Sequence, residues 1–329
     1  ALPPRPFKPN LVDMRTFEEG RELLERKYRL IGSVVEKPDI PETAVDKTKF
    51  PRLHLQKIAG IGGGVSGQVF ESIDLETGAL IAVKEIIISN KEDIPEEIKR
   101  EAMLLRQLSH PNIIEFYGVG WVEDTLCIVT EFCSGGSLHR QLNRGPINDA
   151  RLLKNYCFQI LEGLNYLHDH AIIHRDIKPG NILIDRRGVL KLCDFGSVLK
   201  AQSCATQQGP LVGTVAYMAP EAVIGSQAAR AHPITTKSDI WSFGCTLLHM
   251  VTGKRPWHNL DNDLAILYRL GMSSDVPDVK EDMMVHVGPD CAAMIRSCLQ
   301  RDPEKRPSAE WLIYESDFLR NPASFRYYY

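Results

Sequence analysis

The first part of this chain shows short apolar runs of the β type, separated by turn residues. These runs begin at Leu53, and clear examples cover residues 79–88, 113–122 and 125–132. A cap residue, a proline and an acid between residues 93 and 96 then mark the start of a helix. The pattern therefore predicts a β-rich part that contains one helix.

The second part of the chain has helical periodicity. Residues 149–168 predict an amphipathic helix, because five apolar residues form one stripe: Leu153, Cys157, Ile160, Leu164 and Leu167. Residues 238–251 are apolar on nearly all sides and precede Gly253, which indicates a buried helix that ends at this glycine.

Two charged residues stand in apolar surroundings. Lys84 lies in the middle of the run 79–88, on the strand face of Ala82 and Ile86. Glu101 fills a gap in the apolar stripe of the helix that follows, so its carboxylate is expected to point inward. A buried charge needs a partner, and the sequence predicts an ion pair between Lys84 and Glu101.

A glycine-rich segment precedes Lys84. Residues 58–70 read IAGIGGGVSGQVF, and Gly62, Gly64, Gly67 and Val69 fit the pattern GxGxxGxV. Glycines let a backbone approach a polyphosphate closely. A tight hairpin or a dinucleotide site would share the spacing, but β-type residues follow Gly67 where a dinucleotide site would have a helix.

The segment HRDIKPGN, residues 174–181, concentrates chemistry in eight residues. It holds Asp176 and Asn181, and Asp194 follows in the triplet DFG. Two carboxylates and an amide are suited to hold a divalent metal and to orient a hydroxyl group.

These segments together resemble the H-R-D-x-x-x-x-N and D-F-G signatures of protein kinases. The resemblance covers about residues 53–319. It implies an α+β, bilobal protein kinase fold, with a small β-rich N-lobe with one helix (53–131) and a larger mainly helical C-lobe (138–320). A hinge (131–137) would join the lobes.

The resemblance also implies roles for single residues. Asp176 and Lys178 would be catalytic, and Asn181 and Asp194 would hold Mg²⁺. Residues expected to bind ATP are Ile61, Gly62, Gly64, Gly67, Val69, Ala82, Lys84, Glu101, Thr130, Glu131, Cys133 and Leu183. The tip residues Val65 and Ser66 stand where the family often has an aromatic residue.

Further matches lie downstream. Thr214 matches the threonine that meets the catalytic Asp and Lys of serine/threonine kinases, and Asp239 matches a residue that binds the catalytic-loop backbone. Arg306 is expected to pair with Glu221. Ser203 and Thr206 are candidate regulatory phosphosites; the alternative is that they are unmodified exposed hydroxyls.

Within the family, HRDIKPGNIL and GTVAYMAPE look most like the sterile-20-like group, and there like a mitogen-activated protein kinase kinase kinase. KPGN departs from the KGAN common at that level and leans toward the kinase-kinase level. The substrate would be Ser/Thr of another kinase. Two alternatives are a pseudokinase-like scaffold and a nucleotide-dependent interaction module that does not transfer phosphate.

Composition agrees with a soluble, cytoplasmic globular protein. The chain has 329 residues and a net charge of −3, which does not suggest a nucleic-acid surface. No apolar run has the length of a membrane span, and none of the eight cysteines forms a CxxC pair.

The first 52 residues resemble none of these motifs. Residues 11–31 predict an amphipathic helix, which is either a regulatory or docking element or a surface segment without a function of its own. Residues 37–51 have the composition of a linker. An upstream activator or scaffold is expected to act on the chain.

Overall fold

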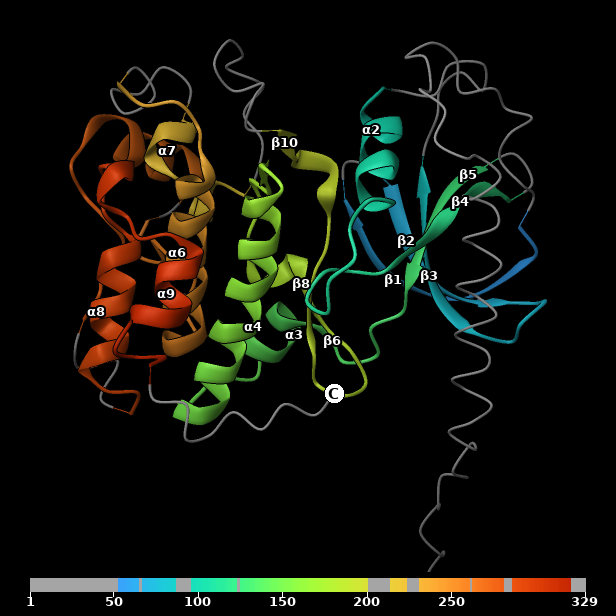
Figure 1. Cartoon of the computed structure of the whole chain (residues 1–329), viewed down its shortest axis with the longest axis horizontal. Helices are drawn as coiled ribbons and strands as arrows, with labels where there is room; N and C mark the ends of the chain where they lie inside the picture. The colour runs from blue at the N-terminus through green and yellow to red at the C-terminus, as the bar shows by residue number, and fades with distance from the viewer. Residues whose placement is uncertain are drawn as a thin grey trace, which may run out of the picture. The chain divides into compact units, whose positions relative to one another are not determined.

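The structure is a computed structural model that describes residues 53–64, 67–86, 96–122, 125–200, 214–223, 231–260, 262–280 and 286–320. The chain divides into two compact units (Figure 1). The described residues up to 107 and residues 115–132 form the first unit. Residues 108–114 and those from 133 onward form the second unit.

The first unit is built on a five-stranded antiparallel sheet of order β1-β2-β3-β5-β4 (Figure 1). Its strands are β1 (Leu55–Gly64), β2 (Gly67–Asp74), β3 (Leu80–Ile86), β4 (Phe116–Val122) and β5 (Thr125–Glu131), and its helix is α2 (Glu96–Leu105). One face of the sheet carries a core of Leu53, Ile81, Val83, Cys127 and Val129. The predicted β-rich part with one helix is thus present.

The second unit is mainly helical. Its longer elements are α3 (Leu138–Leu142), α4 (Ala150–Asp169), α6 (Thr236–Thr252), α7 (Asp263–Met272), α8 (Pro289–Cys298) and α9 (Ala309–Glu315). Its short strands are β6 (Gly136–Ser137), β7 (Ile172–Ile173), β8 (Ile182–Ile184), β9 (Leu190–Leu192) and β10 (Leu199–Lys200). Helix α4 packs against α6 and α9, and α6 packs against α8.

The two helices predicted for this unit begin and end within two residues of the expected positions. Asp149 caps α4 by accepting hydrogen bonds from the N–H groups of Arg151 and Leu152, and the five residues of the predicted stripe are fully buried. In α6 every residue from 238 to 251 is buried. Gly253 ends α6 in the left-handed conformation, with φ of 65°.

The strand predicted at residues 113–122 starts later, at Phe116. Ile113 and Ile114 pair instead with Leu192 of β9, and the Asn112 side chain donates to the carbonyl of Leu190 at 2.9 Å. These bonds explain why residues 108–114 group with the second unit. Their apolar character reflects burial there and not membership of the sheet.

Several predictions concern residues outside the described ranges. They are the helix at 11–31, the linker at 37–51, the tip residues Val65 and Ser66, and the phosphosites Ser203 and Thr206. Among the described residues, no helix combines the length and apolar character needed to cross a membrane.

Candidate active site

One face of the sheet in the first unit gathers the predicted nucleotide-binding residues. In the strand register, Val69 lies opposite Lys84, and Ala82 lies opposite Thr130. Directly opposed residues of antiparallel strands point to the same face, and so do residues two apart on one strand. These four side chains therefore share one face, while the core cluster occupies the other.

Lys84 and Glu101 form the ion pair that the sequence predicts. The Lys84 Nζ atom lies 3.0 Å from Oε1 and 3.3 Å from Oε2 of Glu101, and the two side chains are only 16% and 8% exposed. The carboxylate comes from α2, and the ammonium group comes from β3. The pair fixes the ammonium group on the sheet face of Val69 and Thr130.

The glycine-rich segment forms the hairpin between β1 and β2. Gly67 has a φ of 138°, and a Cβ atom there would lie 1.9 Å from the Glu85 carbonyl oxygen, so only glycine fits. A Cβ atom on Gly62 would meet nothing within 4 Å. Gly62 lies opposite Val69, which places open space beside the candidate nucleotide face.

The remaining predicted nucleotide-binding residues differ in setting. Ile61 is exposed on β1, and Glu131 lies on the sheet face opposite to Thr130, where its Oε1 atom accepts the N–H of Glu115 at 2.8 Å. In the second unit, Cys133 is buried and Leu183 is half-buried on β8.

Asp176 is the centre of a hydrogen-bond network in the second unit. Its Oδ1 atom accepts the N–H of Thr214 at 2.9 Å. Its Oδ2 atom accepts from Lys178 Nζ at 2.6 Å and from Asn181 Nδ2 at 2.8 Å. The carboxylate is 8% exposed, so three donors hold a nearly buried anion in one orientation.

Lys178 ties the same network to a distant segment. Its Nζ atom also donates to Thr214 Oγ1 at 2.6 Å. Thr214 directly precedes the 3₁₀ turn η5 (Val215–Tyr217). The segment that begins at Thr214 is thereby joined to the Asp176 carboxylate directly, through the backbone N–H of Thr214, and indirectly, through Lys178, which donates to both the Thr214 hydroxyl and the carboxylate.

Asp239 of α6 holds the backbone of the loop that carries Asp176. This fully buried carboxylate accepts the N–H groups of His174 at 2.9 Å and Arg175 at 2.8 Å, and the Nε2–H of His168 at 3.0 Å. Arg175 has a φ of 68°, a conformation that is unfavourable for a residue with a Cβ atom. The two backbone bonds explain how this strained conformation persists.

His174 connects this loop to the Asp194 segment. Its Nδ1 atom accepts the N–H of Asp176, so its Nε2 atom carries the proton and donates to the Cys193 carbonyl at 3.1 Å. The centroid of its ring lies 5.1 Å from the centroid of the Phe195 ring. Asp194 itself is exposed and has a φ of 64°.

The side-chain oxygen atoms of Asn181 and Asp194 are suited to bind a Mg²⁺ ion whose other ligands would be phosphate oxygens. The Asn181 Nδ2 atom donates to both the backbone carbonyl and the carboxylate of Asp176, so the Oδ1 oxygen of Asn181 is the atom that would hold a metal. In the described ranges, no three His, Cys, Asp or Glu side chains group as a metal cluster. Two oxygen ligands plus phosphate oxygens is the arrangement that Mg²⁺ prefers.

Glu221 and Arg306 form a fully buried, two-pronged ion pair. The Arg306 Nη atoms lie 2.6 Å and 2.9 Å from the two carboxylate oxygens, and neither side chain is exposed. Ser238 Oγ donates to the same carboxylate at 2.7 Å. The pairing predicted from the sequence is present, and it anchors the segment that follows η5.

One contact behind this segment was not predicted. The Tyr217 hydroxyl lies 2.7 Å from His249 Nδ1, and His249 is 6% exposed. Burial, and to a smaller extent the neighbouring His139, lower the pKa of His249 to about 4. The neutral ring therefore accepts the Tyr217 hydroxyl hydrogen. The available signal was a histidine in the mostly apolar second half of α6.

The buried His249 makes stability dependent on pH. Its pKa is about 4 in the folded chain and 6.5 in the unfolded chain, so protonation favours unfolding. The associated stability is present above pH 6.5 and is lost between pH 6.5 and about pH 4, by on the order of 2–3 kcal/mol.

Urea unfolding at several pH values checks this prediction. His249→Asn keeps an acceptor oxygen without titrating, and we expect a flatter pH profile than that of the natural chain. His258→Asn, at an exposed histidine, is the control. Equal slopes for the His249 variant and the natural chain would contradict the assignment.

Comparison with known proteins agrees with this geometry. The family described as "Protein kinase domain" matches residues 55–318. Serine/threonine-protein kinase SSK22 of Saccharomyces cerevisiae is 39% identical over 280 residues, which cover 79% of this chain and 20% of the relative. MAP kinase kinase kinase wis4 of Schizosaccharomyces pombe is 35% identical over 320 residues, which cover 92% of this chain and 22% of the relative.

A plant relative is similar as well. Mitogen-activated protein kinase kinase kinase 3 of Arabidopsis thaliana is 40% identical over 265 residues, which cover 79% of this chain and 42% of the relative. The chain thus spans about a fifth of the length of the two fungal relatives. The names support the kinase-kinase-kinase part of the sequence resemblance and correct the broader sterile-20-like label.

Proposed function

The chain belongs to the protein kinase family, and we propose that it is a serine/threonine kinase that transfers the γ-phosphate of ATP to a protein. The observation that carries this proposal is the network in which Thr214, Lys178 and Asn181 all donate to the Asp176 carboxylate. Each partner is held within 3 Å of a single anion. Such an anion is positioned to receive one further donor, the substrate hydroxyl.

Phosphoryl transfer needs alignment and charge neutralisation more than covalent assistance. Asp176 orients the hydroxyl oxygen toward the γ-phosphorus and accepts its hydrogen bond. Lys178 lies beside this carboxylate and neutralises charge on the transferred group. Lys84, fixed by Glu101, binds the α- and β-phosphates. When bound through Asn181 and Asp194, Mg²⁺ supplies further neutralisation of the phosphate charge.

The bond between Lys178 and Thr214 favours serine and threonine as acceptors. In the resemblance that the sequence carries, Lys178 and this threonine belong to the serine/threonine class. Two of the relatives described above bear the name of kinase kinase kinases. We therefore propose a MAP kinase kinase as the protein substrate and a place in a phosphorylation cascade.

A panel of kinase-dead MAP kinase kinases tests the substrate class. Each is incubated with the chain, ATP and Mg²⁺, and the modified residues are mapped by mass spectrometry. We expect phosphate on serine or threonine of at least one panel member. Phosphate on tyrosine alone would contradict the assignment.

Regulation is proposed at the segment between Asp194 and Thr214. Arg175 directly precedes Asp176 and offers a cation for a phosphate on Ser203 or Thr206. We expect replacement of both residues by alanine to lower transfer, as measured by the initial rate on the protein substrate. An unchanged rate would contradict this role.

The proposed location is the cytoplasm. None of the seven cysteines among the described residues forms a disulfide, and a reducing compartment keeps thiols in this state. An upstream activator or scaffold is part of the same proposal, because cascade kinases of this class receive a signal before they act.

A further inference from the structure

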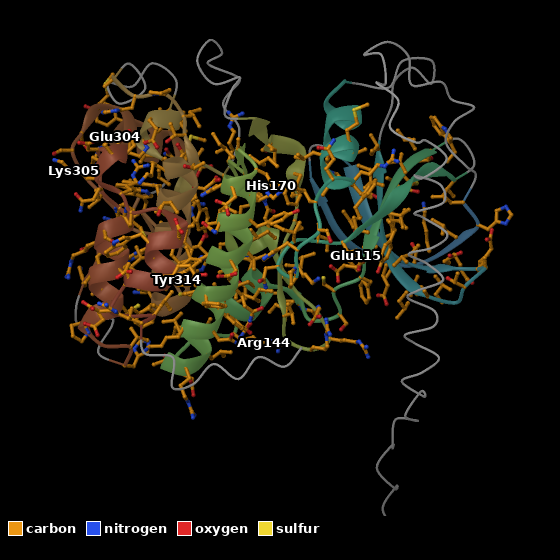
Figure 2. All side chains as sticks on the ribbon, viewed as in Figure 1. Glu115, Arg144, His170, Glu304, Lys305 and Tyr314 are labelled. Carbon is orange, nitrogen blue, oxygen red and sulfur yellow. The ribbon has the colours of Figure 1, made fainter. Side chains whose placement is uncertain are left out.

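Helix α9 presents two aromatic side chains to solvent. Trp311 and Tyr314, the latter labelled in Figure 2, are 48% and 62% exposed, whereas the other three tryptophans of the chain are buried or half-buried. Residues three apart are neighbours on a helix surface, so the two side chains form one aromatic pair. Together they expose on the order of 300 Å², the size of the apolar patches that often mark interaction sites.

The rest of α9 holds this aromatic pair on a fixed platform. Ala309, Leu312 and Ile313 are buried, and the helix packs against α4. The N-cap residue Ser308 accepts the N–H of Trp311 at 3.0 Å, which fixes the first turn of the helix. A surface that is already ordered loses little conformational entropy when a ligand binds.

The surroundings of the aromatic pair are acidic. Residues 309–319 read AEWLIYESDFL and include no cation, but they include three exposed carboxylates, Glu310, Glu315 and Asp317. Among the described residues, no cation forms an ion pair with Glu310 or Asp317, and Arg320 Nη2 lies 3.9 Å from Glu315. The surface therefore suits a ligand that combines apolar rings with positive charge.

A basic polyproline II helix has this chemistry. Proline-rich segments dock on aromatic side chains, and the polyproline II conformation is already populated before binding, so little entropy is lost. The pyrrolidine rings would pack on the two aromatic rings of α9. Arginine or lysine residues on a neighbouring edge of the ligand would face the carboxylates.

The first ten residues of this chain have the required pattern, although they lie outside the described ranges. They read ALPPRPFKPN, with four prolines, two cations and no acid. A polyproline II helix has three residues per turn, so residues three apart share an edge. One edge would carry Pro3, Pro6 and Pro9, and a second edge would carry Arg5 and Lys8.

We propose that Trp311 and Tyr314 bind the proline-rich segment 3–9 of the same chain. Residues 10–52 connect this segment to the described part, and at about 3.3 Å per residue they span up to about 140 Å, enough to reach α9. A second copy of the chain fits less well, because a stable dimer buries about 800 Å² per partner. The proposal does not depend on phosphoryl transfer, and its test needs none.

The chain supplies a matched pair of probe peptides. The first is residues 1–10, and the second is residues 37–46, KPDIPETAVD, which also has prolines three apart but carries three acids and one cation. Both are acetylated, amidated and labelled for fluorescence anisotropy. The receptor is the full chain with Pro3→Ala, Pro6→Ala and Pro9→Ala, so that its own segment does not compete.

We expect the first peptide to bind this receptor, and the second to bind at least about 10-fold more weakly because its acids face those of α9. Adding Trp311→Ala should raise the Kd of the first peptide at least about 10-fold, the effect of losing one interface anchor. Tyr268→Ala, at another exposed aromatic residue, should leave it unchanged. Circular dichroism and thermal unfolding confirm that the variants are folded.

Three results of these titrations would overturn the proposal. They are no binding of the first peptide, equal Kd values for the two peptides, and an unchanged Kd after Trp311→Ala. Binding that is lost equally in Trp311→Ala and Tyr268→Ala would also overturn it, because it would not be specific to α9.

A comparison with the natural chain decides whether its own segment is the occupant. The natural chain should bind the first peptide at least about 10-fold more weakly than the triple-proline variant, because the tethered segment competes at an effective concentration on the order of 1 mM. Equal affinities would assign the surface to another protein and overturn the proposal. Self-association of the natural chain in sedimentation, lost in Trp311→Ala, would assign it to a second copy and overturn the proposal as well.

Discussion

Replacing Asp176 by asparagine should reduce phosphoryl transfer by roughly 10²–10⁴-fold, the usual contribution of a positioned acid–base group. The asparagine has the same shape and keeps an oxygen for the N–H of Thr214. It loses the second acceptor oxygen, to which Lys178 Nζ and Asn181 Nδ2 donate in the natural chain. The variant therefore cannot orient and deprotonate the substrate hydroxyl as the natural chain does.

Nucleotide binding should survive this change, since Lys84, Glu101 and the glycine-rich hairpin lie in the first unit. Initial rates of transfer and the binding of a fluorescent ATP analogue measure the two properties separately. Asp169→Asn, at an exposed carboxylate after the α4 stripe, serves as the matched control. Full activity of the Asp176 variant would contradict the proposed role of this carboxylate.

Replacing Arg306 by methionine should lower the free energy of unfolding of the second unit by about 3–5 kcal/mol. The guanidinium donates to both oxygens of Glu221 and to the carbonyls of Gln300 and Lys237. Without the guanidinium, the Glu221 carboxylate, which has no exposure, keeps one side-chain hydrogen-bond donor among the described residues, the hydroxyl of Ser238. The penalty comes from leaving this charge buried and unpaired.

Urea unfolding, followed by the signal of the second unit, measures this loss. Arg144→Met is the matched control, because the side chain of Arg144 is exposed (Figure 2). The double variant Glu221→Leu/Arg306→Met removes both charges and should recover part of the lost stability. A double variant that is no more stable than Arg306→Met would contradict the explanation by an unpaired charge.

Local periodicity was sufficient to predict much of the framework. The stripe of α4, the buried run of α6 and the glycine at residue 253 all depend on residues within a few turns of one another. The ion pair of Lys84 and Glu101 was also predictable, because each charge interrupts an apolar pattern and each needs a partner. These features follow from neighbouring residues and from the cost of burying charge.

Contacts between distant residues were harder to predict. The N–H of Thr214 reaches Asp176 across 38 positions, and no periodic pattern reports a backbone bond of this kind, so this contact was predicted only through the family resemblance. The Tyr217–His249 contact depends on how η5 packs against α6. Ile113 and Ile114 look like the start of a strand of the sheet, but they pair with β9 and are apolar because they are buried in the second unit. Tertiary context decides these cases.

The most direct test of the kinase assignment is the transfer of labelled γ-phosphate from ATP and Mg²⁺ by the purified chain, compared with Asp194→Asn. We predict that the natural chain labels itself or a kinase-dead MAP kinase kinase, and that the variant does not. A natural chain that binds ATP but transfers no phosphate, even with the segment around Ser203 and Thr206 phosphorylated, would contradict it and indicate a scaffold.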